Sequence, residues 1–268
     1  MTQFNQANVS RFSGFADEYD RYRPSPPVVV TEILPQLIGQ PRPRRVVDLG
    51  SGTGLSTRLW AGRADEVIGI EPSPDMRGVA EAQSAGMAGI RYQEGHSAAT
   101  GLADGGADII CCTQAFHWME PAATLREACR VLRDGGVFCT VDCDWPPVIH
   151  WEVDRAFHAF MVGIHESEER HGIYQTVQRW QKDRHLANIT ASGLFRYTNE
   201  IVVHQVESAD AHRLLGLLQT FGSVKDLQKH GLSDDEIGIT AFRAVAQRVL
   251  GEGMLPIYFS YRLRLGVK

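Results

Sequence analysis

Residues 46–54 read VVDLGSGTG, an apolar run that ends in three glycines at alternate positions. Glycine has no Cβ and adopts positive φ readily, so a turn of this kind lets the backbone come close to a ligand. A second apolar run, 67–70, is followed directly by Glu71. An acidic residue after the second strand of a β-α-β unit is placed to accept hydrogen bonds from ribose hydroxyls. The two features together predict a site for a nucleoside cofactor.

The spacing of the glycines indicates which cofactor this is. In the dinucleotide-binding pattern the third glycine comes three residues after the second, at the position that Leu55 holds here. In this chain Gly54 comes two residues after Gly52, and the turn that begins at Asp48 reads D-x-G-x-G-x-G. This pattern resembles motif I of the class I S-adenosylmethionine-dependent methyltransferases. The alternative interpretation is a glycine-rich strand–helix turn that binds no ligand.

Composition limits the classes of protein to which the chain can belong. Its 268 residues are 43% apolar, which is ample for a buried core, and its net charge is −5. The longest basic run, 42–45, is interrupted by a proline, whereas nucleic-acid-binding proteins more often present a clustered basic face. These features favour a small-molecule substrate over a nucleic-acid partner. No internal repeat or linker divides the chain, so we expect a single domain over residues 1–268.

The five cysteines lie within one stretch, 111–143, and form no C-x-x-C pair. Zinc sites and secreted disulfide frameworks have characteristic cysteine spacings, so buried free thiols in a reducing compartment fit this pattern better. The first residues lack the basic region and apolar core of a signal peptide. No apolar run reaches the ~20 residues of a membrane-spanning helix. We therefore expect a cytoplasmic protein with no metal site and no membrane segment, and the oligomeric state is left open.

From residue 45 the hydrophobic pattern alternates between strands and helices. It predicts strands at 45–49, 66–70, 89–93, 107–113 and 136–143, with helices between them at 54–62, 74–85 and 122–132. Strands separated by helices of this length are typical of an α/β fold with a doubly wound parallel sheet. In this interpretation residues 1–43 form an N-terminal cap and residues 44–145 form the cofactor-binding core.

After Trp145 the pattern changes. It predicts helices at 152–169, 176–192, 209–230 and 234–250, the last capped by Ser233, and strands at 199–206 and 256–265. Segments 150–185 and 209–230 are interpreted as helical insertions that form a substrate lid above the sheet.

The glycine turn and the next strand supply the first site residues. Backbone N–H groups at the start of the helix after Gly54 favour a negative charge, which suits the carboxylate of a methionine tail. Asp48, at the end of its strand, is placed to hold the methionine amine directly or through water. The alternative is a solvated strand-end aspartate. Glu71 is placed to bind the ribose, and Pro72 and Met76 to cover the adenine face.

Further motifs strengthen the resemblance. Residues 95–102 read GHSAATGL, residues 114–118 read QAFHW, and residues 22–24 read YRP. Together they resemble a branch of the type 11 group of class I methyltransferases that includes the trans-aconitate and cantharidin small-molecule methyltransferases. The resemblance is strong over 12–145 and loose over 256–266. It implies a Rossmann-like sheet of seven strands, the last of them antiparallel, with helical lid insertions.

The chain departs from this family pattern in one loop. His96 stands where many relatives have the aspartate that binds the adenine amino group, so that contact would come from the backbone or from Ser97. Ala98 replaces the usual glutamate. His117 is a candidate general base, although a histidine at a strand end more often packs or orders a loop. Many enzymes on this fold transfer the methyl group by proximity and alignment alone.

The residues that these patterns and the resemblance indicate for cofactor binding are Tyr22, Arg23, Asp48, Gly50, Ser51, Gly52, Gly54, Glu71, Pro72, Met76, His96, Ser97 and Gln114. For Arg23 two alternatives stay open, which are pairing with an acidic substrate and a solvated position on the surface.

The resemblance implies methyl transfer from S-adenosylmethionine to a small-molecule acceptor, which releases S-adenosylhomocysteine. One alternative is a nicotinamide-dependent oxidoreductase, which Leu55 disfavours. The other is a non-catalytic nucleoside-binding regulatory protein, which the altered loop at 95–98 keeps open. The N-terminal aromatic residues are predicted to fold over the cofactor and to become ordered when it binds, or else to dock the terminus permanently; they are Phe12, Phe15, Tyr19 and Tyr22.

Overall fold

The computed structural model describes residues 8, 11, 14–173 and 178–268. Its strands are β1 (Arg45–Leu49), β2 (Glu66–Ile70), β3 (Ile90–Gln93), β4 (Ala107–Thr113), β5 (Leu132–Cys143), β6 (Tyr197–Ala209) and β7 (Leu255–Val267). They form one sheet in the order β3-β2-β1-β4-β5-β7-β6. Strands β1 to β5 pair in parallel, and β7 runs antiparallel to both β5 and β6. The predicted α/β sheet with an antiparallel last strand is confirmed.

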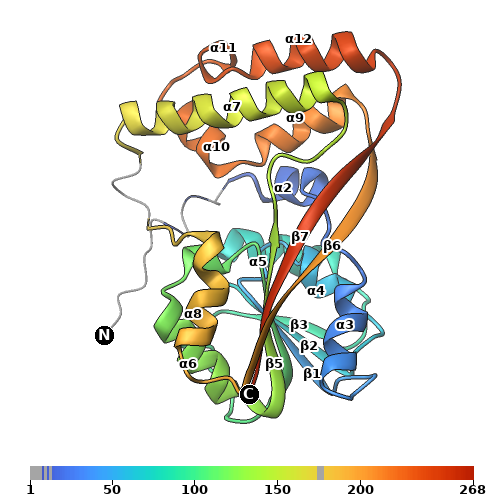
Figure 1. The fold of residues 1–268 in the computed structure, drawn as a ribbon, viewed down its shortest axis with the longest axis vertical. Coiled ribbons are helices and arrows are strands. Elements are labelled where there is room, and N and C mark those ends of the chain that lie inside the picture. The colour runs from blue at the N-terminus through green and yellow to red at the C-terminus, as the bar shows by residue number, and fades with distance from the viewer. Residues whose placement is uncertain (1–7, 9–10, 12–13, 174–177) are drawn as a thin grey trace.

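Helices cover both faces of the sheet, and a further helical layer lies beyond one end of it (Figure 1). One face carries α6 (Pro121–Val131) and α8 (His185–Ala191), and the other carries α3 (Val30–Leu37), α4 (Leu55–Leu59) and α5 (Pro74–Gln83). The helical layer consists of α7 (Trp151–Arg170), α9 (Ala211–Gln219), α10 (Gly222–Lys229), α11 (Asp234–Ile237) and α12 (Ile239–Leu250). Between the layer and the sheet lies α2 (Ala16–Tyr22), which contacts both α9 and α5.

Successive residues of the central strands pack on opposite faces of the sheet. Val46 and Ile109 join a hydrophobic cluster that continues into the helical layer, whereas Val47 and Ile110 join the cluster beneath α6. Side chains alternate along a strand, so a strand covered on both faces needs apolar residues at every position. This requirement explains the continuous apolar runs in the sequence.

The helical layer has an aromatic core of its own. The ring of Phe157 in α7 packs edge-on against Phe242 of α12 at 5.7 Å and against Phe221 at 6.2 Å. Trp145, which follows β5, packs against Phe221 at 5.1 Å. Strands β6 and β7 extend from the sheet up to this layer as a two-stranded ribbon (Figure 1). Both strands are longer than the strands predicted at 199–206 and 256–265.

Several predicted helix boundaries were wrong. The helical segment predicted at 209–230 is two helices, because Phe221 has an extended backbone (ψ 124°) that turns its ring into the aromatic core. The helix predicted at 234–250 is split at Gly238, whose φ is +91°. The predicted helix at 176–192 is shorter in the structure. Residues 178–180 are irregular, a 3-10 turn covers Lys182–Arg184, and α8 begins at His185. Residues 176 and 177 lie outside the described residues.

The composition of the helical layer also differs from the predicted lid. Helices α11 and α12 belong to the layer and pack against α7, whereas α8 lies on the sheet with β6 and β7. Helices α11 and α12 lie outside the segments 150–185 and 209–230 that were predicted to form the lid, because which face a helix packs on depends on partners distant in the chain. That the layer covers a substrate stays a prediction.

Two helix glycines should respond oppositely to alanine. A Cβ on Gly216 of α9 would lie 2.2 Å from Cδ1 of Tyr22, so we expect Gly216→Ala to destabilise the protein by about 1–3 kcal/mol. A Cβ on Gly163 of α7 meets nothing within 4 Å, so Gly163→Ala should stabilise by about 0.5–1 kcal/mol. Urea unfolding measures both changes. Equal effects would contradict the packing of α2 against α9.

Candidate functional site

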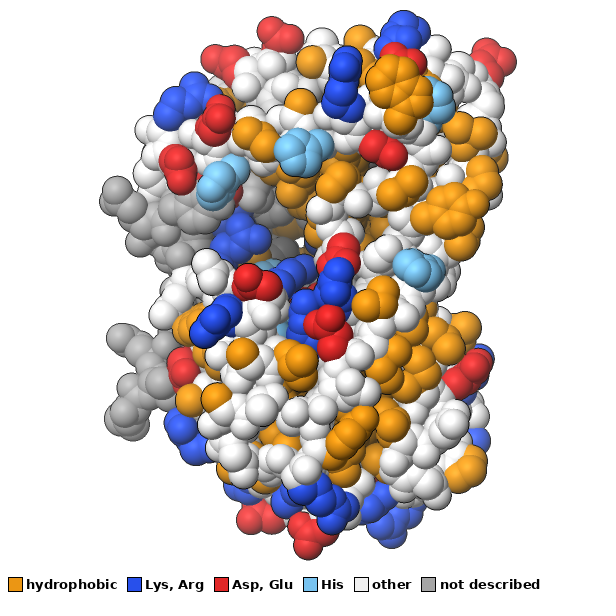
Figure 2. Space-filling model, viewed as in Figure 1, with side chains coloured by type: hydrophobic (Ala, Val, Ile, Leu, Met, Phe, Trp, Pro, Cys, Tyr) orange, Lys and Arg blue, Asp and Glu red, His pale blue; other side chains and the backbone are white. Residues whose placement is uncertain are grey.

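A cavity of about 430 Å³ opens at the carboxyl ends of β1, β2 and β4. In α/β sheets ligands bind at this edge where the strand order reverses, as it does here between β1 and β4. Figure 2 shows the surface hollowed at the waist between the helical layer and the sheet. The predicted cofactor residues that line the cavity are Arg23, Gly50, Ser51, Gly52, Glu71, Pro72, Met76, His96, Ser97 and Gln114.

The glycine turn forms the floor of this cavity. The amides of Gly50 and Ser51 both donate to the Ile70 carbonyl, which holds the turn against the end of β2. Gly52 has φ +54°, and a Cβ built on it would meet no atom within 4 Å. The Ser51 and Thr53 hydroxyls are buried without a hydrogen-bond partner in the structure. A close backbone approach with unsatisfied polar groups fits a polar ligand.

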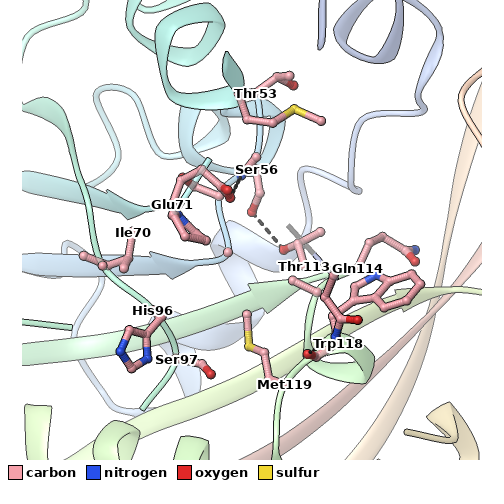
Figure 3. A pocket seen from close by; sticks show the side chains of 18 of the residues that line it. Thr53, Ser56, Ile70, Glu71, His96, Ser97, Thr113, Gln114, Trp118 and Met119 are labelled. Carbon is pink, nitrogen blue, oxygen red and sulfur yellow. Dashed lines mark hydrogen bonds between the residues drawn. The ribbon is translucent and has the colours of Figure 1, made fainter. Parts of the chain in front are cut away.

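Glu71 follows the end of β2 and lines the cavity beside the glycine turn (Figure 3). Its Oε2 accepts a hydrogen bond from the Gly52 amide at 2.9 Å and its Oε1 accepts one from the Ser73 amide at 2.8 Å. Burial raises the pKa of this carboxyl above its ordinary value, and these two amides partly oppose the shift. An ionised carboxylate has about four lone-pair sites, so capacity to bind two hydroxyls remains.

Asp48 lies beneath the turn instead of on the cavity wall. Its side chain is fully buried, Oδ2 accepts a 2.6 Å hydrogen bond from Thr57 Oγ1, and Oδ1 has no partner. Burial raises its pKa to about 6. The hydrogen bond from Thr57 lowers the pKa and so opposes this shift, whereas the charge of Glu71 raises it further by a smaller amount. The alternative of a solvated aspartate is therefore wrong. Contact with a methionine amine stays a prediction.

The raised pKa of Asp48 makes stability depend on pH. The folded state keeps this proton up to about pH 6, whereas a solvated aspartate loses it near 3.8, so the stability contribution present below pH 3.8 is lost as pH rises through 6. The difference corresponds to about 3 kcal/mol. We expect Asp48→Asn to remove that decline, measured by urea unfolding between pH 4 and 7. The exposed Asp183→Asn is the control, and parallel curves for wild type and Asp48→Asn would refute this prediction.

Residues 95–98 also line the cavity. The Ala98 amide donates to Nδ1 of His96 at 3.3 Å, which places the proton of a neutral ring on Nε2. His96 then has a donor at Nε2 and cannot replace a carboxylate as acceptor for an amino group. Ser97, Pro72 and Met76 all line the cavity, and contact of Ser97 with the adenine amino group stays a prediction.

At the other end of the cavity lie Gln114 and Trp118 (Figure 3). Gln114 has φ +54°, and its Oε1 accepts a 2.7 Å hydrogen bond from Lys182. Asn8 closes this end, since its amide donates to the carbonyls of Trp118 and Gln178 and its Oδ1 accepts from the Gln178 amide. Asn8 and the loop at 178–180 therefore meet over the cavity.

The N-terminal tyrosines take different positions. Tyr19 lines the cavity, whereas Tyr22 packs against His212 of α9, with ring centroids 5.7 Å apart, and does not line it. Gly54 does not line the cavity either. It packs against Tyr92, because a Cβ on Gly54 would lie 2.3 Å from the Tyr92 hydroxyl. The predicted aromatic Phe12 lies outside the described residues. Ordering of this segment on cofactor binding stays a prediction.

His117 is buried behind Trp118, with ring centroids 4.9 Å apart, and does not line the cavity. Burial lowers its pKa well below the ordinary value, and the positive charges of Lys182 and Arg179 add to this effect. Its Nδ1 lies 4.0 Å from Asp142 Oδ1 and has no hydrogen bond. A catalytic-base role for His117 thus gains no support from the geometry.

Several lining residues were missing from the predicted set. Thr113 ends β4, hydrogen-bonded to Ser56 at 2.9 Å, so the rule that sites lie at strand ends could have identified it. Gln178 and Trp180 lie in an irregular loop whose sequence has no motif. The described residues contain no cluster of three potential metal ligands and no helix long and apolar enough to cross a membrane. All five cysteines are free thiols, as predicted.

Comparison with known proteins identifies the family of this site. Residues 47–140 match the family model described as a methyltransferase domain. The chain carries a class I methyltransferase domain. Relatives of this domain include an uncharacterised methyltransferase of Mycobacterium tuberculosis, 35% identical over 129 residues that cover 47% of this chain and 49% of the relative. A malonyl-[acyl-carrier protein] O-methyltransferase of Pseudescherichia vulneris is 29% identical over 156 residues, 56% of this chain and 59% of that protein.

The methyltransferase domain also has solved structural relatives. A protein assigned as a type II methyltransferase from Anaeromyxobacter dehalogenans has a TM-score of 0.66 and 20% identity, and the match covers 92% of this chain and 98% of that one. This similarity extends beyond residues 47–140, so it supports the fold over most of the chain. The chain spans about half the length of the first curated relatives it matches by sequence.

Proposed function

We propose that the protein transfers a methyl group from S-adenosylmethionine to a small-molecule acceptor and releases S-adenosylhomocysteine. The observation that carries this proposal is the position of Glu71 beside Gly52, at the switch point of a methyltransferase-domain sheet. The carboxylate and the open glycine turn stand where a nucleoside with a charged tail would bind.

The residues present fit the cofactor. Glu71 would bind the ribose hydroxyls, and Pro72 and Met76 would pack on the adenine opposite His96 and Ser97. The Ser51 and Thr53 hydroxyls of the glycine turn, which lines the cavity, are polar groups that a methionine tail would satisfy. When bound, S-adenosylmethionine supplies a methyl group already activated on a sulfonium.

The protein's contribution is then alignment and exclusion of water. Asn8, Gln178 and Trp180 close the cavity, and Gln114 and Trp118 form the wall against which an acceptor would rest. Proximity and alignment are sufficient for a displacement by a group that is already nucleophilic. The acceptor itself is not assigned beyond a small molecule that fits this cavity.

Cofactor binding gives a direct test of the proposed function. We expect S-adenosylmethionine and S-adenosylhomocysteine each to raise the Tm, because a ligand at 100 times its Kd stabilises the folded state by about 2.7 kcal/mol. NAD at the same concentration should leave the Tm unchanged. A shift with NAD alone would support the oxidoreductase alternative and contradict this proposal.

The non-catalytic alternative needs a separate measurement. A regulatory protein would bind both ligands but would not release S-adenosylhomocysteine from S-adenosylmethionine with any acceptor. Release during incubation with a panel of small acids, phenols and amines, detected by mass spectrometry, would establish turnover.

A further inference from the structure

Arg23 is a cation of the cavity wall that has no carboxylate partner among the described residues. With the described residues its side chain makes one hydrogen bond, from Nη1 to Thr220 Oγ1 at 3.1 Å, and no ion pair. A guanidinium has five N–H donors, and none of those of Arg23 is both buried and unsatisfied. The remaining donors are therefore accessible from the cavity that the residue lines.

Aromatic rings hold this guanidinium in place. Its Cζ lies 5.0 Å from the ring centroids of Trp145 and Phe221 and 5.4 Å from that of Tyr19. Cation–π contacts fix the plane and position of the group without neutralising its charge. A planar, preorganised guanidinium with free donors is suited to bidentate binding of an oxyanion.

The surroundings of Arg23 add positive charge. Lys182 lies at the same end of the cavity, where it donates to Gln114. The nearby Asp142 carboxylate is buried, paired with His185 and Arg264, and 3.7 Å from Lys182 Nζ, so its charge is shared among three cationic or basic neighbours and it does not pair with Arg23. Of the described lining residues only Glu71 and Glu120 are acidic, and Glu120 accepts hydrogen bonds from the first amides of α6.

The location of Arg23 separates it from the nucleoside end. Ser25, two residues on, accepts a hydrogen bond from Tyr261 of β7, and Trp145 follows the end of β5. Glu71 lies at the end of β2, and β2, β1, β4 and β5 are successive strands. Three spacings of ~4.8 Å place the ends of β2 and β5 about 14 Å apart. Arg23 thus lies on the acceptor side of the strands that the cofactor would cover.

We infer that Arg23 binds an oxyanion of the methyl acceptor, which is therefore an anionic small molecule. This inference rests on the proposed function and moves Arg23 from the predicted cofactor set to the acceptor site. Carboxylate and phosphate share the chemistry that the guanidinium recognises, and the test uses a probe of each.

The probes are sodium acetate and sodium phosphate, added to the protein saturated with S-adenosylhomocysteine, with sodium chloride at matched ionic strength as reference. The readout is the indole N–H resonance of Trp145, one of five tryptophans in the chain, assigned with Trp145→Phe. We expect a saturable shift with at least one oxyanion. Arg23→Met should raise the probe Kd about tenfold or more, and Arg23→Lys should restore it only in part. Arg21→Met, at an exposed position in the last turn of α2, is the control and should leave the Kd unchanged.

A cofactor role for Arg23 would give a different result. S-adenosylhomocysteine has a carboxylate tail and methylthioadenosine has none. If Arg23→Met weakens the first tenfold and the second not at all, Arg23 binds the cofactor and the inference is wrong. The absence of any saturable shift beyond that of chloride would also overturn it. If S-adenosylhomocysteine fails to bind the wild type, the proposed function fails instead, and the same oxyanion titration on the protein alone still tests Arg23.

Discussion

Replacing Glu71 by alanine is expected to weaken S-adenosylhomocysteine binding tenfold or more. Charge-assisted hydrogen bonds contribute roughly 1.5–3 kcal/mol each, and 1.4 kcal/mol corresponds to a factor of ten in Kd. The variant also loses the acceptor for the amides of Gly52 and Ser73, so the turn itself becomes less ordered. Isothermal titration calorimetry, at a temperature well below the Tm of the variant, measures the change.

The control for this experiment is Glu94→Ala. Glu94 follows β3, its side chain is 79% exposed, and it lies 3.5 Å from Arg77, outside the cavity lining. It should bind S-adenosylhomocysteine as the wild type does. Unchanged affinity in a folded Glu71→Ala variant would remove this carboxylate from the cofactor site.

A side chain on Gly52 is expected to reduce cofactor binding by about a hundredfold or more. Gly52 lines the cavity with φ +54°, and no atom lies within 4 Å of the position that a Cβ would occupy. Asparagine tolerates this left-handed conformation better than other residues, so Gly52→Asn should fold with only modest strain. Its side chain would occupy the space into which the ligand approaches the backbone. Calorimetry with S-adenosylhomocysteine measures the loss.

Gly62→Asn separates ligand exclusion from strain. Gly62 has φ +70°, open space around its Cβ position and no part in the cavity lining. Both variants should lower the Tm by similar amounts, but only Gly52→Asn should lose binding. Equal affinities in the two variants would show that the turn does not contact the cofactor.

Where local patterns determine structure, the sequence predicted the fold well. Strand β1 and the turn after it follow from the apolar run at 46–49 and from glycines that have positive φ in the structure. The alternation of strands and helices predicted the parallel half of the sheet. The helix cap at Ser233 was also predicted from the sequence, and in the structure it is a capping box whose two hydrogen bonds join residues three positions apart.

Other features depend on partners distant in the chain. The break at Phe221 exists because its ring completes a cluster with Trp145 and Phe157, which belong to other parts of the sequence. The burial of Asp48 depends on the helix that packs above it, so a strand-end carboxylate became a buried group with a raised pKa. No local sequence pattern predicts the helix break at Phe221 or the burial of Asp48.

For the candidate site, the sequence by itself determined the nucleoside end. Glu71 and the glycine turn are brought together by one β-α-β unit, whose geometry is local and repeats across folds. Only the tertiary structure decided the end of the cavity where we propose that the acceptor binds. There Arg23 meets the rings of Trp145 and Phe221 and faces a cavity closed by Asn8, across contacts that span most of the chain. Such contacts depend on how the helical layer packs on the sheet, and a one-dimensional pattern does not encode that packing.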